Sequence, residues 1–201
     1  YMAFSSVLSG TYQSAVMARE MILEEYPEAR IEIVDTLAAA GGEGFLVMLA
    51  AEKRDQGLSL EQVVSEMKSI APRLYSHFLV DDLYHLMRGG RLSKSSAIVG
   101  SLVNIKPLLW IDEAGKLAPL VKLRGRKKGI REMIDRSVQD LDLGTVVVAH
   151  ANDPEAAQEI EDKLLEKDGV ERVLQLPLGP VIAAHVGPGT LALFSVGKRE
   201  R

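Results

Sequence analysis

The sequence contains no cysteine, which excludes disulfide bonds, thiolate nucleophiles and cysteine-bound metal ions. Aromatic residues make up only 5% of the chain, so aliphatic side chains must build the core. No apolar run reaches the roughly 18 to 20 residues that a membrane span needs, and no secretory signal pattern leads the chain. We therefore expect a cytoplasmic protein with no stable membrane insertion.

Basic residues are too few to dominate the charge. The 201 residues include 24 Lys and Arg against 28 Asp and Glu, which gives a net charge of −4. A general nucleic-acid-binding protein is usually basic overall, so this charge balance argues against that class. A net charge of −4 is nevertheless compatible with a local basic patch. Hydrophobic residues at 47% and charged residues at 26% are typical of a globular protein.

Helical and strand-like patterns alternate along the chain, which predicts the α/β class. Apolar residues at three- and four-residue intervals predict a helix over 11–25, and a strongly apolar segment over 41–54 predicts a buried helix. Ser59 and Gln62 have the spacing of a capping box, so a third helix should begin there. The other expected helices span 82–87, 93–103, 127–141 and 154–167, and the expected strands span 1–4, 30–34, 77–80, 105–111, 117–123, 145–149, 170–176 and 191–196.

Two α/β domains are the expected organisation. Pro72 interrupts the helical pattern, so we place a boundary nearby and predict domains over residues 1–76 and 77–201. The segment from Tyr1 to Phe4 has the pattern of the tail of a strand that runs directly into a turn. We therefore expect the chain to start inside its first domain.

A loop of small residues between a strand and a helix is the first candidate site. It runs from Ser5 to Thr11 (SSVLSGT) and places three serines and a threonine before a helix N-terminus. Unpaired backbone N–H groups and the helix dipole favour an anion there, and hydroxyls can donate to a carboxylate or phosphate without adding charge. Alternatively, Ser9 or Thr11 caps the helix and the other residues form a turn.

Two clusters of cations form the next candidate sites. In the segment 88–94 (RGGRLSK), the glycines allow the backbone to approach a ligand closely, and Arg91 could pair with an anion through two hydrogen bonds. In the segment 123–128 (LRGRKK), cations at a helix N-terminus oppose the dipole, which favours a further role, such as contact with a phosphate or an acidic partner. Each cluster can also be a solvated surface, the first as a helix C-cap.

His185 is the third candidate. It stands among apolar residues beside a Gly-Pro-Gly turn at 187–189, where a histidine can bind a ligand or lie in the core with its hydrogen bonds satisfied. The four histidines have no zinc-ligand spacing, so we expect no metal site. The chain has no Gly-x-Ser-x-Gly elbow, phosphate loop or His-Glu-x-x-His pattern, and the glycines at 41, 42 and 44 indicate close helix packing.

Together these segments resemble the DegV family. The matching stretches occur in the family's order and cover nearly the whole chain. They are SSVLSGTYQSA (5–15), Asp35-Thr36 with Gly42 and Gly44, LMRGGRLSKSSAIVGSLVNIKPLL (86–109), GKLAPLVKLRGRKK (115–128) and LGPVIAAHVGPGTLAL (178–193). The resemblance implies two α/β domains with a long-chain fatty acid buried between them, and no other cofactor.

The resemblance also implies a role. Members of the family include the acyl-binding subunits of bacterial fatty acid kinase, whose ATP-binding partner phosphorylates the presented carboxylate to an acyl phosphate. By this resemblance the protein is a non-catalytic lipid-binding subunit of phospholipid metabolism. The family normally begins with a further strand and helix that this sequence does not contain, so the first domain is expected to lack them.

Site residues follow from the same resemblance, matched motif by motif. The expected carboxylate-binding residues are Ser5 or Ser6, His185 and, near the head group, Arg91. The expected kinase-facing residues are Arg124 and Arg126. The motif does not distinguish Ser5 from Ser6.

Two other functions are alternatives. Ser5 or Ser6 could act with His185 in a serine-dependent acyl hydrolase, although no acidic residue that would orient the histidine lies near it in the sequence. The segment from Arg124 to Lys128 could belong to a regulatory module that binds an anion or nucleic acid. The net charge and the scarcity of aromatic residues count against that second alternative.

Overall fold

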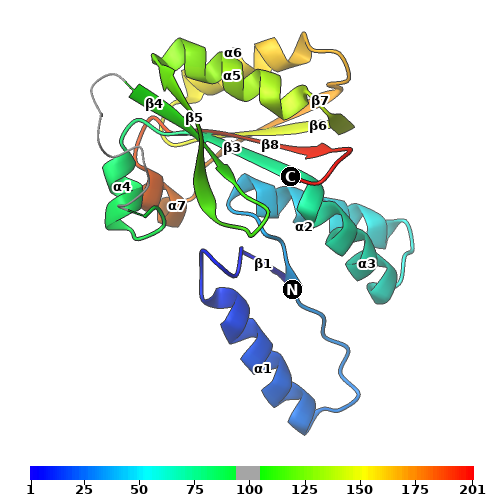
Figure 1. The fold of residues 1–201 in the computed structure, drawn as a ribbon. Coiled ribbons are helices and arrows are strands. Elements are labelled where there is room, and N and C mark those ends of the chain that lie inside the picture. The colour runs from blue at the N-terminus through cyan, green and yellow to red at the C-terminus, as the bar shows by residue number, and fades with distance from the viewer. Residues whose placement is uncertain (94–104) are drawn as a thin grey trace.

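The computed structural model describes residues 1–93 and 105–201, with residues 105 and 106 described by their backbone alone. Its largest element is a six-stranded sheet (Figure 1). The strands of this sheet are β3 (Leu74–Leu79), β4 (Ile105–Ile111), β5 (Leu117–Arg124), β6 (Leu141–His150), β7 (Arg172–Pro177) and β8 (Leu191–Gly197). Their order across the sheet is β5-β4-β3-β8-β6-β7. Strands β6 and β7 pair in parallel, and the other neighbours pair antiparallel.

A two-stranded parallel sheet lies near the N-terminus. It joins β1 (Met2–Ala3) to β2 (Val34–Asp35), and the hydroxyl of Thr36 donates to the Ala3 carbonyl at 2.7 Å. The expected strand over 30–34 is therefore wrong in extent. Residues 30–33 alternate like a strand, but they have no strand to pair with among the residues that the structure describes, and a strand requires a partner.

Helices cover both faces of the large sheet, as expected of the α/β class (Figure 1). They are α1 (Thr11–Glu25), α2 (Gly41–Asp55), α3 (Leu60–Ile70), the 3-10 turn η1 (Ala71–Arg73), α4 (Leu83–Arg88), α5 (Arg126–Val138), α6 (Pro154–Leu165) and α7 (Pro180–Val186). Helices α5 and α6 pack on one face, α2 and α3 lie on the opposite side, and α4 packs against α7 at one end. The sequence patterns did not predict α7, and the helix expected over 93–103 lies outside the described residues.

Helix α2 is buried, as predicted, because glycines bring it into contact with the sheet. A Cβ atom on Gly41 or Gly42 would stand 2.8 Å from ring atoms of Phe194, so neither position can carry a side chain without displacing that ring. On the same helix, Phe45 and Leu46 are almost fully buried.

The capping box predicted for α3 is also present, since the Ser59 hydroxyl accepts from the Gln62 N–H and the Gln62 side chain accepts from the Ser59 N–H. Local sequence signals therefore fix both helices.

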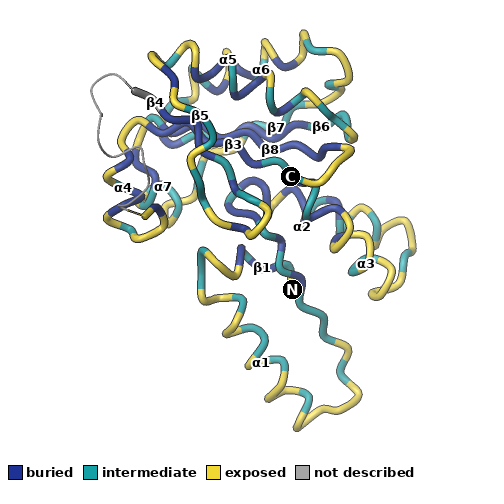
Figure 2. The backbone as a smooth tube through the Cα atoms, viewed as in Figure 1, coloured by how far each residue is buried: buried dark blue, intermediate teal, exposed yellow. Residues whose placement is uncertain are grey.

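Helix α1 forms over the predicted residues, but none of its residues is buried (Figure 2). Met17, Met21 and Ile22 are exposed along it, and so is the C-cap residue Tyr26. The helix connects to the body of the molecule through the loop that precedes it and through the segment that follows it. It therefore adds little to the described hydrophobic core.

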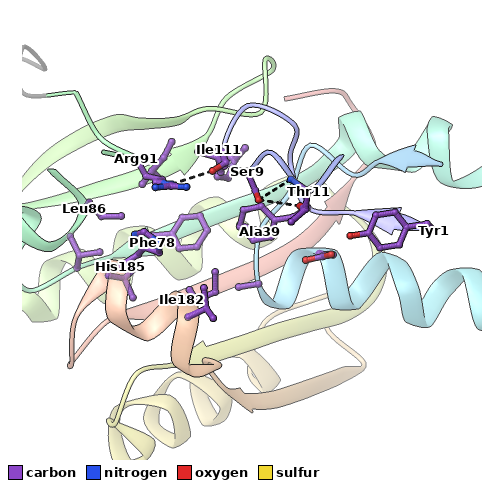
Figure 3. Close-up of a pocket in the computed structure, with 18 residues that line it drawn as sticks. Tyr1, Ser9, Thr11, Ala39, Phe78, Leu86, Arg91, Ile111, Ile182 and His185 are labelled. Atoms are coloured by element: carbon purple, nitrogen blue, oxygen red, sulfur yellow. Dashed lines mark hydrogen bonds between the residues drawn. The ribbon is translucent and has the colours of Figure 1, made fainter. Parts of the chain in front are cut away.

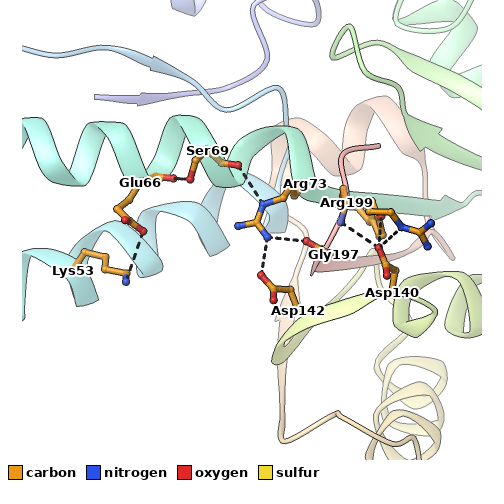
Figure 4. Close-up of polar contacts among 9 residues, drawn as sticks. Lys53, Glu66, Ser69, Arg73, Asp140, Asp142, Gly197 and Arg199 are labelled. Atoms are coloured by element: carbon orange, nitrogen blue, oxygen red, sulfur yellow. Dashed lines mark hydrogen bonds and ion pairs between the residues drawn. The ribbon is translucent and has the colours of Figure 1, made fainter.

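The expected domain boundary between residues 76 and 77 falls inside β3. Arg73, just before this strand, donates to the Asp142 carboxylate at 2.6 Å and to the Gly197 carbonyl at 3.0 Å (Figure 4). The guanidinium of Arg201 reaches back to the Leu37 and Ala71 carbonyls, both at 3.0 Å. These bonds link the two segments across the boundary, and the division into two domains stays a prediction.

Candidate functional site

A cavity of about 410 Å³ lies between the N-terminal loop, the first turn of α2, the sheet and the α4–α7 pair. Most of its wall is apolar (Figure 3). The apolar lining includes Phe4, Leu8, Phe78, Leu86, Ile111 and Ile182. The polar lining consists of Tyr1, Ser9, Thr11, Glu43, Arg91 and His185. The residues come from parts of the chain separated by up to 185 positions, so the fold, and not local sequence, builds this site.

Arg91 connects two of the sequence motifs. Its Nη1 donates to the Gly89 carbonyl at 2.7 Å, and its Nε donates to the Leu8 carbonyl at 3.2 Å. Gly90 has a φ of +71°, a conformation that glycine adopts without strain, and this turn directs the chain from α4 toward the cavity. The RGGR segment is therefore bonded to the SSVLSGT loop, with the exposed Arg91 guanidinium at the cavity.

His185 lies in the last turn of α7 and lines the same cavity as Arg91. Helix α7 begins with Pro180, which suits the first helical position, and ends before Gly187, whose φ of +79° turns the chain. A Cβ atom on Gly89 would stand 2.3 Å from His185 Nδ1, so the glycine that ends α4 allows the two helices to meet. Arg91 and His185 are thus brought to one cavity, and their role in binding a ligand stays a prediction.

Ser5 and Ser6 do not line the cavity. The Ser5 side chain is fully buried, and its hydroxyl donates to the Gly115 carbonyl at 2.7 Å, in the turn between β4 and β5. Ser6 is exposed, and its backbone N–H donates to Asp35 Oδ1 at 3.3 Å. Their assignment as carboxylate ligands stays a prediction. The Ser5 bond adds a third motif, GKLAP, to the set that meets here.

Ser9 and Thr11 supply the loop's hydroxyls to the cavity instead. Their oxygens lie 3.1 Å apart, and Ser9 Oγ also accepts from the Thr11 backbone N–H at 3.3 Å (Figure 3). Gly10 occupies the N-cap position of α1 without a side-chain cap. Both hydroxyls belong to the loop whose sequence predicts either an anion site or a helix cap, whereas the family resemblance assigns the carboxylate to Ser5 or Ser6.

Glu43 is the acidic group of the cavity wall. It stands in the first turn of α2, and burial raises the pKa of its carboxyl above the usual range, which favours the neutral form. Helix α2 thus contributes Glu43 to the cavity wall, next to Ala39 and Ala40, which precede the helix.

Arg124 and Arg126 differ in their surroundings. Arg124 is exposed at the end of β5 and forms no ion pair within residues 1–93 and 105–201. Arg126 donates to Asp81 Oδ1 at 2.9 Å and pairs with Asp153, and its side chain is only 27% exposed. The two arginines that the motif treats alike are therefore not equally available to a partner.

The hydrolase alternative finds no support in the hydrogen bonds of the serines. The Ser5 hydroxyl donates to a carbonyl, so this bond cannot pass its proton to His185. In the described part of the chain, the serine–histidine hydrogen bond joins Ser137 of α5 to His77 of β3 at 3.0 Å, and both residues are buried.

The cations of the RGRKK segment continue onto the outer helices. A second hollow, of about 510 Å³, lies between α5 and α6 on the face of the sheet opposite the first cavity. Its charged lining is Lys127, Lys128, Arg131, Asp135, Lys163, Glu166 and Lys167. Lys163 pairs with Glu159 at 2.5 Å and Lys167 with Asp135 at 2.7 Å, so part of this positive charge is neutralised locally.

Two other kinds of site are absent from the described residues. No group of three or more His, Asp or Glu side chains there could hold a metal ion. Within the same ranges, no helix combines the length and the hydropathy that crossing a bilayer requires.

Comparison with known proteins identifies the family. The DegV family, described as uncharacterised proteins, matches residues 1–198. A DegV domain-containing protein of Streptococcus pyogenes serotype M1 is 58% identical over 201 residues, which are all of this chain and 70% of that protein.

Solved structures agree with this match. A fatty-acid-binding DegV family protein from Thermus thermophilus is 33% identical, with a TM-score of 0.85 over 96% of this chain and 69% of that one. The Streptococcus pneumoniae fatty acid kinase (Fak) B3 protein, loaded with linoleic acid, is 28% identical, with a TM-score of 0.89 over 97% of this chain and 70% of that one. The sequence motifs, the fold and these matches agree, and the chain belongs to the DegV family.

Proposed function

We propose that this protein binds a long-chain fatty acid in the cavity beside His185 and presents its carboxylate to an ATP-binding fatty acid kinase subunit. The observation that carries the proposal is the lining of the cavity, in which apolar side chains form most of the wall and Arg91 and His185 supply donors. Its volume of about 410 Å³ lies in the range of small-molecule sites. The fatty-acid binding of the Thermus protein and the linoleic acid in the pneumococcal protein support the same class of ligand.

Burial of the tail supplies the affinity. A sixteen-carbon chain gains on the order of 12 kcal/mol gross, at about 0.8 kcal/mol per methylene. Loss of translational freedom and ordering of the chain reduce this to a smaller net value. The apolar walls that Phe78, Ile111 and Ile182 contribute are the surface that receives the tail.

The head group requires donors, because a carboxylate that loses water on entry must recover its hydrogen bonds. In this proposal His185 and the loop 5–11 provide them. Ser9 and Thr11, which line the cavity, join Ser5 and Ser6 as candidates within that loop. Neutral donors leave the carboxylate oxygen more nucleophilic than a purely cationic clamp would, which suits an oxygen that must attack ATP.

Phosphoryl transfer belongs to the partner in this proposal. The protein itself is the non-catalytic lipid-binding subunit. Because the kinase requires ATP, the proposed reaction takes place in the cytoplasm. The exposed Arg124, at the end of β5, is the cation that would face the kinase and its phosphates.

The test begins with mass spectrometry of lipid extracted from the purified protein, followed by titration with the fluorescent fatty acid cis-parinaric acid. Wild-type protein should carry a long-chain fatty acid and bind the probe saturably, and the His185→Gln variant should bind it at least tenfold more weakly. Arg124→Gln should bind normally but yield less acyl phosphate with the kinase and ATP. Arg30→Gln, at an exposed arginine that pairs with Glu61, is the control. Wild-type protein that neither carries a fatty acid nor binds the probe would contradict the proposal.

A further inference from the structure

We infer that Arg126 is a positioning residue which, through Asp81, holds the Gly187–Gly189 turn and with it His185 at the cavity. The inference rests on the proposed function only where it takes His185 as a ligand-binding group. It assigns Arg126 a role inside the protein, distinct from the kinase-facing role of Arg124.

The first step is the binding of one guanidinium by two carboxylates. Arg126 Nη1 lies 2.9 Å from Asp81 Oδ1, and its Nη2 pairs with Asp153. Asp81 follows β3, and Asp153 stands at the N-cap of α6, where its Oδ1 accepts from the Ala156 N–H at 3.2 Å. A planar guanidinium can bridge two acceptors in fixed directions, which a lysine ammonium cannot do with the same geometry. Arg126 therefore joins the starts of α5 and α6 to the end of β3.

The electrostatics of α5 indicate that this bridge is more than a helix-stabilising contact. Arg126 is the first residue of α5, where a cation opposes the helix dipole. The two carboxylates offset that cost. Because the Arg126 side chain is only 27% exposed, water screens these pairs less than it would screen pairs on an open surface.

The second step leads from Asp81 to the turn after His185. A Cβ atom on Gly189 would stand 2.3 Å from Asp81 Oδ2, so one carboxylate oxygen faces Arg126 and the other lies against the Gly189 backbone. Gly189 has a φ of +76°, and its N–H donates to the Ala151 carbonyl at 2.8 Å. Asp81 and the segment after β6 therefore hold this glycine from two sides.

The third step leads from the turn to His185. The other end of the turn, Gly187, lies against the ring of His85, with a Cβ atom there only 2.6 Å from Cδ2. The Gly187 N–H donates to the Ala183 carbonyl at 2.8 Å, and the Thr190 hydroxyl donates to the Val186 carbonyl at 3.0 Å. His185 is two residues from Gly187, so any displacement of the turn moves the last turn of α7 and the imidazole with it.

Three of the four histidines provide the readout. The imidazole Hε1 signals of His185 and His85, in ¹H–¹³C correlation spectra, report the two sides of the turn. His77, bonded to Ser137 of α5, reports the opposite face of the sheet. We expect Arg126→Gln and Asp81→Asn each to shift the His185 and His85 signals and to leave His77 in place. The double variant should resemble the single ones, because the two residues act through one contact.

The matched control is Arg124→Gln, which removes the same charge two residues away. It should leave all these signals unchanged. In titrations with cis-parinaric acid, we expect Arg126→Gln to lower the affinity about tenfold and Arg124→Gln to leave it at the wild-type value. If Arg126→Gln does not fold, Asp81→Asn, which keeps the Asp153 pair and the cap of α6, gives the same test.

Two outcomes would overturn the inference. In the first, a folded Arg126→Gln or Asp81→Asn variant retains the wild-type His185 signal. In the second, Arg124→Gln shifts that signal as much as Arg126→Gln does. Failure of the proposed function is a separate result, because a wild-type protein that does not bind cis-parinaric acid still reports its His185 position in the spectra.

Discussion

Gly89 lies directly against the imidazole of His185. A Cβ atom at position 89 would stand 2.3 Å from Nδ1 of that ring, a distance that real contacts do not reach. Gly187 meets His85 in the same manner. Each of the two short helices, α4 and α7, thus ends at a glycine that packs on a histidine of the other. This close approach places Arg91, two residues after Gly89, at the same cavity as His185.

Substitution of Gly89 by alanine should displace the His185 ring, because its Nδ1 occupies the space that the methyl group needs. We expect a loss of stability of about 1–3 kcal/mol, typical of overpacking, and at least tenfold weaker binding of cis-parinaric acid. Urea unfolding and fluorescence titration measure the two effects. Gly44→Ala is the control, since its Cβ atom would meet no atom within 4 Å. Equal behaviour of the two variants would show that the Gly89 contact is unimportant.

Ser5→Ala should destabilise the protein, because the buried Gly115 carbonyl would lose the hydroxyl that donates to it at 2.7 Å. An unsatisfied buried acceptor costs about 1–3 kcal/mol. Ser6→Ala, at an exposed side chain, should change the free energy of unfolding by less than about 0.5 kcal/mol. Thermal and urea unfolding of both variants measures the difference. A Ser5→Ala variant as stable as wild type would mean that the loop and the β4–β5 turn are not coupled through this bond.

Thr11→Val removes a hydroxyl from the cavity wall while keeping the branched shape of the side chain. Because Thr11 is not buried in the core, the free energy of unfolding should change little. Affinity for cis-parinaric acid should fall several-fold if this hydroxyl takes part in binding the head group. Thr36→Val removes a hydroxyl that donates to the Ala3 carbonyl instead, and it should show the reverse pattern. We expect this variant to have a lower free energy of unfolding and a nearly unchanged affinity for cis-parinaric acid.

His77 should make stability depend on pH. Burial, with a smaller contribution from the nearby Arg136 charge, lowers the pKa of His77 from 6.5 to about 4. At pH values between these two pKa values, the His77 imidazole therefore binds a proton in the unfolded chain but not in the folded chain. The free energy of unfolding should have its full value above pH 6.5. It should fall as the pH drops toward 4, by roughly 3 kcal/mol in total.

The measurement is urea unfolding between pH 4.5 and 7.5. His77→Asn, which retains an amide group for Ser137, should flatten this dependence even if it lowers stability overall. His150→Asn is the control. A wild-type stability that stays constant, or rises, as the pH falls from 6.5 would contradict the assignment of a buried neutral imidazole.

Local signals predicted those parts of the fold whose cause is local. The capping box of Ser59 and Gln62 and the apolar pattern after Gly41 need only neighbouring residues, and both helices form where expected. Helix α7 was missed because its seven residues are too few to show a helical period between flanking Gly and Pro. Strand β2 is shorter than expected because only Val34 and Asp35 find a partner strand.

The candidate site was predictable as a set of motifs but not as a set of contacts. Nothing near Ser5 in the sequence indicates that its hydroxyl bonds to Gly115, 110 residues away. Similarly, Arg124 and Arg126 belong to one motif, and only the positions of Asp81 and Asp153 in the fold distinguish them. Tertiary placement decides which member of a motif faces solvent and which is held inside.

The position of β8 in the large sheet has a consequence for synthesis. This strand follows the other five in the sequence, yet it lies between β3 and β6 and pairs with both. Until residues 191–197 have left the ribosome, β5-β4-β3 and β6-β7 exist as separate pieces with unpaired edges, which are prone to misassociation. The pairing of β3 with β8 also spans more than a hundred residues, so closing the sheet is a slow, non-local step. The nascent chain therefore passes through a stage in which the two halves of its sheet await their shared central strand.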